Sequence, residues 1–150
     1  MCYHRGMLLG ITVHRNLTNP ADVAGALRAL LDSLARDSRT PSDAPVLLTL
    51  VSPLAMGTDR LAAHAVLGIP GGTLRVVLPL PPGEYEEDFP SEDARGEFRD
   101  LLDRAESVEI LPNRPTRAAA YEAVGRRVVE ACDLLIAVWD GEPARGRGGV

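Results

Sequence analysis

Five short apolar runs recur along the chain, and each is separated from the next by enough residues to form a helix. The runs are Met7–Val13, Val46–Val51, Leu74–Leu80, Ser107–Leu111 and Leu134–Trp139. Strands that are apolar along most of their length are buried on both faces, and this requires helices above and below the sheet. The alternation therefore predicts an α/β fold, a three-layer doubly wound parallel sheet of about five strands with the order 3-2-1-4-5.

The segments between the runs carry apolar residues at helical spacing, with charged residues on the opposite side. Three amphipathic helices are expected, over Ala21–Arg36, Ser91–Glu106 and Thr116–Cys132. Thr116 is the expected N-cap of the third helix, because a threonine hydroxyl accepts hydrogen bonds from first-turn N–H groups. The expected buried stripe of the second helix is Ala94, Phe98, Leu101, Leu102 and Ala105. That of the third is Ala120, Tyr121, Val124, Val128 and either Ala131 or Cys132.

The charge balance argues against several classes of partner. The net charge is −5, so the chain lacks the basic character by which a general nucleic-acid binder neutralises phosphates. All 16 basic residues are arginine, which excludes lysine Schiff-base chemistry and a Walker-type lysine. No apolar run approaches the ~18 residues of a membrane span, and no signal peptide is recognisable. We expect a cytoplasmic protein without a membrane partner.

The length of 150 residues fits one domain over residues 1–150. Residues 1–6 are expected to form a flexible N-terminus, and residues 141–150 a Gly/Arg-rich loop with no helix after it. Cys2 and Cys132 are too few for a disulfide framework, and with the 3 histidines they form no metal-ligand spacing. We therefore expect no metal and no cofactor. The apolar helix faces permit a homodimer without requiring one.

The segment Val46–Gly68 points most directly to a ligand. A buried strand is followed at once by a loop with Ser52 and Gly57, and then by a helix that begins near Asp59 and Arg60. Backbone N–H groups and the positive end of a helix dipole converge at such a point, which favours phosphate or another small polar group. The alternative is that Asp59 only stabilises the helix start, and that Arg60 is a solvated helix charge.

Two more loops should meet this one, because the carboxyl ends of parallel strands share one edge of a sheet. His14 and Arg15 follow the first run, where arginine can pair with a phosphate and histidine can bond a ribose or base. Asp140 follows the fifth run. The glycines after it are Gly146, Gly148 and Gly149. The alternatives are a surface loop in which Asn16 and Thr18 only cap the next helix, and a glycine-rich tail that is only disordered.

Four stretches carry a family resemblance: LLGITVHRNL, SPLAMGTDRLAAHA, VVLPLPPGEYEEDFPSEDARGEF and LLIAVWDGEPARGRGG. Together they resemble the SLOG superfamily, Rossmann-like domains grouped with the DNA-processing protein and the "lonely guy" or lysine-decarboxylase-like proteins. The resemblance extends from Leu8 to Gly149 and is closest to uncharacterised bacterial members. It implies a Rossmann-like fold and binding of nucleotides or nucleotide-derived signals, often as a sensor in defence systems.

The chain departs from the family pattern at three places. Members usually have glycine where Val13 precedes the His-Arg pair, and commonly an acidic residue where this chain has His64. They also continue from the final glycines into Thr, Ala or Ser and a Glu-bearing helix, whereas this sequence ends at Val150. The cytokinin-activating members hydrolyse nucleoside 5′-monophosphates with a PGGxGT loop followed by Glu, and no such loop follows the fifth run.

The leading hypothesis is therefore binding of a nucleotide or nucleotide-derived ligand at the carboxyl edge of the sheet. Ser52, Gly57 and the last glycines would contact phosphate, His14 and Arg15 phosphate or ribose, and Asp59 the ribose hydroxyls. One alternative is a nucleoside 5′-monophosphate phosphoribohydrolase, with Asp59 or Asp140 as the acid. Another is a non-catalytic structural or interaction module. Handling of single-stranded DNA is disfavoured by the acidic balance.

Overall fold

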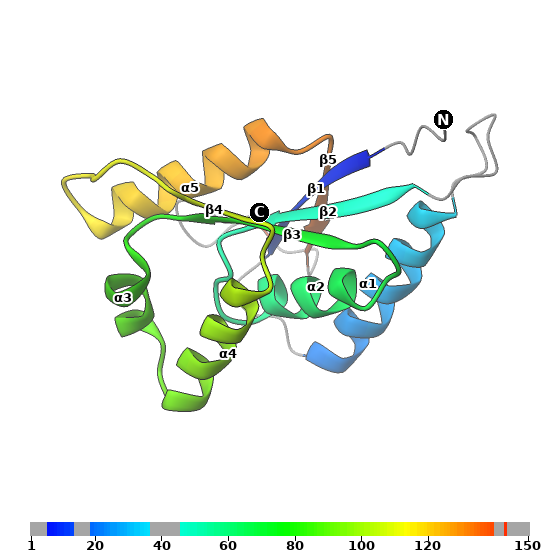
Figure 1. Cartoon of the computed structure of the whole chain (residues 1–150), viewed down its shortest axis with the longest axis horizontal. Coiled ribbons are helices and arrows are strands. Elements are labelled where there is room, and N and C mark those ends of the chain that lie inside the picture. Colours follow the sequence, from blue (N-terminus) through cyan, green and yellow to red (C-terminus); the bar gives the residue numbers. More distant parts are fainter. Residues whose placement is uncertain (1–5, 14–18, 37–45, 140–142, 144–150) are drawn as a thin grey trace.

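The computed structural model of the chain describes residues 6–13, 19–36, 46–139 and 143. Strands and helices alternate through these residues in the way that the apolar runs predict (Figure 1). The strands are β1 (Gly6–Val13), β2 (Leu47–Ser52), β3 (Thr73–Leu78), β4 (Ser107–Ile110) and β5 (Leu134–Val138). The helices are α1 (Pro20–Ala35), α2 (Thr58–Leu67), α3 (Pro82–Tyr85), α4 (Glu92–Asp103) and α5 (Arg117–Ala131), with a 3₁₀ turn η1 (Glu86–Asp88).

Every strand pairing among the described residues is parallel, and the sheet has the order β4-β3-β2-β1-β5. The predicted fold class, a doubly wound parallel α/β sheet with a Rossmann-like layout, is confirmed. The predicted order 3-2-1-4-5 differs from the observed one in the position of the fourth strand. That strand pairs with β3 at the sheet edge, so that β5 takes the place beside β1.

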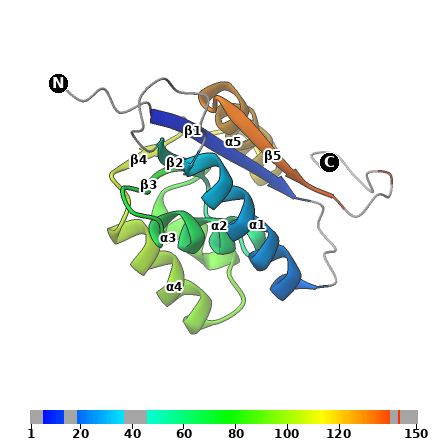
Figure 2. The same cartoon turned by 90° about the vertical axis from the view of Figure 1, so that its right-hand side faces the viewer.

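The position of α4 explains this difference. Its buried residues Ala94, Phe98 and Leu101 belong to the same apolar cluster as Ala63 and Val66 of α2. Figures 1 and 2 show α2 and α4 on one face of the sheet. A right-handed crossover through a helix on that face continues in the same direction, which adds β4 beyond β3. The connection through α5 then returns across the opposite face to β5. Figures 1 and 2 show α5 alone on that face.

Local sequence signals account for the helix starts. The Ser91 hydroxyl accepts a hydrogen bond from the Ala94 N–H at 3.1 Å, and the Thr116 hydroxyl accepts one from Ala119 N–H at 3.1 Å. The predicted N-cap at Thr116 is thus confirmed. The predicted stripe of α5 is buried at Ala120, Val124 and Val128, whereas Tyr121 is only partly covered. Tyr121 is one of the residues that line a cavity beside α5.

The direction of chain progression reverses between β1 and β5. Ligands of open α/β sheets bind beyond the carboxyl ends of the strands at such a switch point. Residues 14–18 and 140–142, which follow these two strands, lie outside the described residues. None of the described helices combines the length and apolar character that crossing a membrane would require.

Candidate functional site

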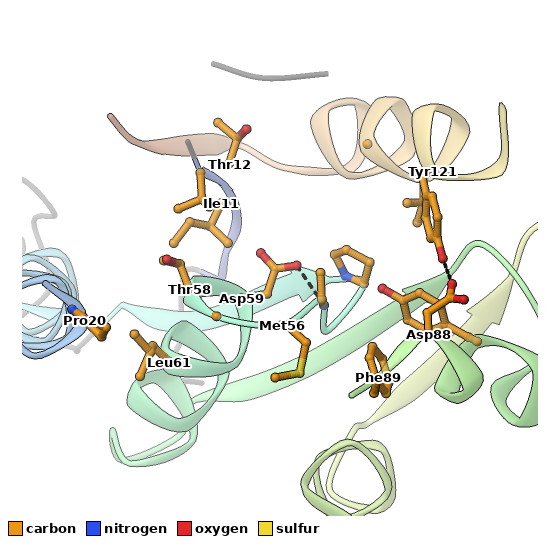
Figure 3. Close-up of a pocket in the computed structure, with 17 residues that line it drawn as sticks. Ile11, Thr12, Pro20, Met56, Thr58, Asp59, Leu61, Asp88, Phe89 and Tyr121 are labelled. Carbon is orange, nitrogen blue, oxygen red and sulfur yellow. Dashed lines mark hydrogen bonds between the residues drawn. The ribbon is translucent and has the colours of Figure 1, made fainter. Parts of the chain in front are cut away.

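A cavity of about 810 Å³ lies at the carboxyl ends of β1 and β2. Its walls come from the end of β1, the β2–α2 loop, the segment of α3 and η1, and the inner face of α5 (Figure 3). The polar groups on these walls are few and the rest is apolar or aromatic, as is typical of small-molecule sites. The lining residues are Ile11, Thr12, Val13, Pro20, Pro53, Ala55, Met56, Gly57, Thr58, Asp59, Leu61, Tyr85, Asp88, Phe89, Tyr121, Val124 and Gly125.

The β2–α2 loop turns sharply before α2 begins. Leu54 has a positive φ of 56°, and Gly57, the N-cap residue of α2, has φ 89° and ψ −123°, a conformation that favours glycine. The buried Ser52 hydroxyl accepts a hydrogen bond from the Leu54 N–H at 3.0 Å and so holds the turn. No side chain of the described residues caps the N-terminus of α2, which leaves its first backbone N–H groups without a side-chain partner. Gly57, Thr58 and Asp59 at this end of the helix line the cavity.

Asp59 provides the carboxylate on this side of the cavity. Its Oδ2 atom accepts a hydrogen bond from the Ala55 N–H at 3.1 Å, which fixes the side chain across the loop (Figure 3). Burial raises the pKa of Asp59 to about 6, although the hydrogen bond from Ala55 and the charge of Arg60 oppose the rise. A carboxyl group with this pKa can exchange a proton near neutral pH.

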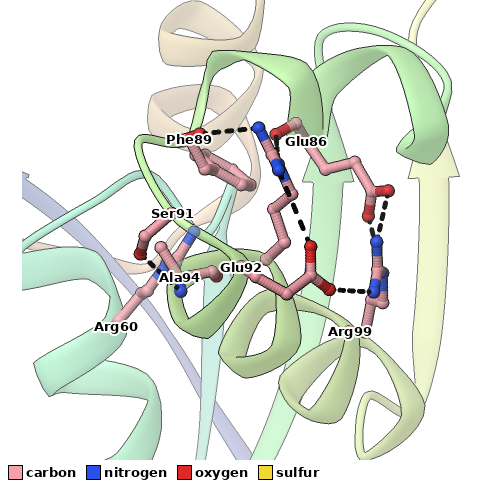
Figure 4. A network of polar contacts seen from close by, with 8 residues as sticks. Arg60, Glu86, Phe89, Ser91, Glu92, Ala94 and Arg99 are labelled. Atoms are coloured by element: carbon pink, nitrogen blue, oxygen red, sulfur yellow. Dashed lines mark hydrogen bonds and ion pairs between the residues drawn. The ribbon is translucent and has the colours of Figure 1, made fainter.

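Arg60 lies next to Asp59 in sequence but does not line the cavity. The residue is only 2% exposed, and Nε donates to the Leu54 carbonyl at 3.2 Å. Nη1 donates to the carbonyl of Ala94 at 2.6 Å, and Figure 4 labels both residues. Nη1 also donates to Glu97 Oε2 at 3.0 Å. Arg60 therefore connects the β2–α2 loop to α4, a role different from both expected ones, phosphate partner and solvated helix charge.

The guanidinium of Arg60 also lies 4.4 Å from the centre of the Phe89 ring. A cation over an aromatic face is attracted by the ring quadrupole. One Arg60 nitrogen, Nη2, is buried without a hydrogen-bond partner among the described residues. The residue thus supports the cavity wall from behind, since Phe89 itself lines the cavity.

The wall opposite the β2–α2 loop is aromatic and acidic. Tyr121 of α5 donates its hydroxyl proton to Asp88 Oδ2, and Arg117 Nη1 donates to the same oxygen at 2.9 Å. The ring of Tyr85 lies 5.1 Å from Phe89, centre to centre. Asp88 and Tyr85 were not predicted as site residues from the sequence, and Tyr121 was predicted only as part of a buried helix stripe. An acidic cluster flanked by two aromatic residues, EYEEDF, was the available signal.

The structure brings some of the predicted site residues together. Gly57 and Asp59 line the cavity, and Val13, which replaces the family's usual glycine, lines it as well. Ser52 is fully buried and acts behind the wall through its bond to the Leu54 N–H. The remaining predicted residues lie outside the described residues: His14, Arg15, Asp140, Gly146, Gly148 and Gly149.

His64 lies away from the cavity and forms a hydrogen bond of 2.9 Å with Glu97 of α4. Within the described ranges, no group of three or more His, Cys, Asp or Glu side chains is arranged to hold a metal ion. Comparisons with models of protein families and with the curated proteins gave no match to this chain.

Proposed function

We propose that the chain binds a nucleotide or a nucleotide-derived small ligand in the cavity at the carboxyl edge of the sheet, as a sensor module of the SLOG type. One observation carries the proposal. The first turn of α2, without a side-chain cap, and the Asp59 carboxyl line the same cavity, which is within the ~300–1,000 Å³ range of small-molecule sites. A nucleotide needs both kinds of group, donors for phosphate and an acceptor for ribose.

In this arrangement Gly57 and Thr58 present backbone N–H groups to the phosphate, where the helix dipole also favours negative charge. Asp59 accepts hydrogen bonds from the ribose hydroxyls. The described ends of β1 and β5 meet at the switch point of the sheet. His14 and Arg15 follow β1 in the sequence and the last glycines follow β5, but all of them lie outside the described residues. Ser52 and Arg60 contribute by holding the β2–α2 loop in shape.

Isothermal titration calorimetry with AMP, GMP, CMP and UMP tests the proposal. We expect at least one to bind, and Asp59→Asn to weaken binding about tenfold, because a charged acceptor of the ribose hydroxyls is lost. Asp100→Asn is the matched control, since Asp100 is exposed on α4 and outside the cavity lining. Absence of binding by all four to a folded chain would favour a structural or interaction module instead.

A second candidate function is hydrolysis of the N-glycosidic bond of a nucleoside 5′-monophosphate. The specific observation is the raised pKa of Asp59, since a carboxylic acid with a pKa near 6 can protonate a departing base. Water then adds to the anomeric carbon and gives a proton back to the Asp59 carboxylate, so that ribose 5-phosphate and the free base are the products and the acid is restored. Incubation with AMP would release adenine, and release that survives both Asp59→Asn and Asp140→Asn would refute these residues as the acid.

A further inference from the structure

Packing does not explain why residue 125, in the wall of the cavity, is a glycine. It lies inside α5, where glycine is less favourable than almost any other residue. A Cβ atom built on Gly125 would have no described atom within 4 Å, so the fold itself has room for alanine. Gly125 also lines the cavity. The space that its missing side chain leaves is therefore part of the cavity.

The neighbours of Gly125 have the chemistry of a site for a planar ring. Tyr121 precedes it by four residues, which places both on one face of α5. Figure 3 shows Met56 and Phe89 across the cavity from α5. Aromatic side chains stack on flat rings, and the flexible thioether of methionine adapts its contact to them. The bare backbone at Gly125 allows a flat ring to approach the helix closely.

A polar group stands at the same end of the cavity. Asp88 uses Oδ2 to accept hydrogen bonds from Tyr121 and Arg117. Its other oxygen, Oδ1, has no hydrogen-bond partner in the described part of the chain, and Asp88 is part of the lining. A carboxylate oxygen accepts from N–H donors, which the edge of a nucleobase carries.

We infer that this end of the cavity, bounded by Met56, Phe89, Tyr121 and Gly125, is the compartment for the base of the ligand. The planar base lies against the α5 backbone at Gly125 and donates an edge N–H to Asp88 Oδ1. This inference rests on the proposed nucleotide binding and specifies how the ligand is oriented. The base occupies the aromatic end, and the phosphate lies toward the first turn of α2.

The test compares Gly125→Ala with Gly96→Ala. Gly96 is also a helix-interior glycine with open space at its Cβ, but it does not line the cavity. Both changes favour the helix, so each should raise Tm by about 2–4 °C. Only Gly125→Ala places a methyl group in the base compartment. It should weaken calorimetric binding of AMP about tenfold or more, whereas Gly96→Ala should leave it unchanged.

Ribose 5-phosphate, which lacks the base, separates this inference from the proposed function. We expect the wild-type chain to bind it at least tenfold more weakly than AMP. Two results would refute the base compartment while nucleotide binding stands. One is that AMP binds Gly125→Ala as tightly as it binds Gly96→Ala, and the other is that ribose 5-phosphate binds wild type as tightly as AMP does. If neither AMP, GMP, CMP nor UMP binds, the proposed function fails and the base compartment fails with it.

Discussion

The two walls of the cavity are held in place by different kinds of interaction. The loop wall, residues 53–59, is connected to α4 by Arg60, which is buried and bonded to two backbone carbonyls and a carboxylate. The aromatic wall, Tyr85 to Phe89, is connected to α5 by Tyr121 and Arg117, which both bond to Asp88 at a partly exposed position. A buried charge therefore holds the loop wall, whereas partly exposed contacts connect the aromatic wall to α5.

This difference has an energetic consequence. A buried hydrogen-bonded charge is expensive to disturb, because each partner that loses it remains unsatisfied away from water. Exposed ion pairs contribute little, because water and salt replace them. The loop wall should therefore keep one shape, whereas the contact between the aromatic wall and α5 can adjust to a ligand. Changing the contacts of one wall tests whether the other wall responds.

The largest effect is expected from Arg60→Ala in the loop wall. The change removes the hydrogen bonds to the carbonyls of Leu54 and Ala94, leaves the buried Leu54 carbonyl without its Arg60 partner, and removes the cation beside the Phe89 ring. We expect the free energy of unfolding, measured by urea denaturation, to fall by about 3 kcal/mol. Arg99→Ala is the control. Arg99 forms short ion pairs with Glu86 and Glu92 but is 49% exposed (Figure 4).

The control should lose no more than about 1 kcal/mol, as exposed ion pairs do. A loss of similar size in the two variants would contradict the distinction between the walls. Such a result would mean that water reaches Arg60 and satisfies the carbonyls when the guanidinium is removed. It would also remove the reason to treat the loop wall as preformed for a ligand.

The next effect concerns the pH dependence of stability through Asp59. Burial raises its pKa from 3.8 to about 6, so between these values the folded chain binds a proton that the unfolded chain has released. Stability contributed by this group therefore falls as pH rises from about 4 to about 6, by about 2–3 kcal/mol, and is constant above that range. Asp59→Asn does not titrate and lacks this decrease.

The measurement is the difference in unfolding free energy between Asp59→Asn and wild type at several pH values. As pH rises from 4 to 6, the variant should become more stable relative to wild type. Above pH 6 the difference should stay constant. Other titrating groups cancel in the difference because both chains share them. A difference that does not change with pH would show that the Asp59 carboxyl is well solvated, and the second candidate function would lose its acid.

The sequence predicted the layers and most of the buried helix positions, because both follow from local periodicity. It wrongly predicted buried strands at both sheet edges, since β4 and most of β5 are exposed. The stripe of Ala94, Phe98 and Leu101 is read directly from helical spacing. The position of the fourth strand could not be predicted from periodicity, because it depends on which face of the sheet the α4 stripe covers. That choice is made by contact with α2, a helix more than 20 residues away in sequence.

The two walls of the cavity also differ in how far the sequence predicts them. Strand, glycine and helix start are adjacent in sequence, so the loop wall with Gly57 and Asp59 was predictable. The role of Arg60 was not, because an arginine in the first turn of a helix is normally exposed. The aromatic wall was missed altogether. Its central contact joins Asp88 to Tyr121, which are 33 residues apart, and no local pattern indicates that they meet.

The smallest effect on stability is expected from Tyr121→Phe, and it tests the aromatic wall most directly. The ring remains, but the hydroxyl that donates to Asp88 is lost, and Arg117 still holds the same oxygen. Unfolding free energy should fall by no more than about 1 kcal/mol. Hydrogen exchange of the backbone amides should nevertheless become faster over residues 84–89 and stay unchanged over residues 53–59, because only the first segment depends on this contact. Equal acceleration in both segments would mean that the walls open as one unit, and the adjustable side of the cavity would then have to be sought elsewhere.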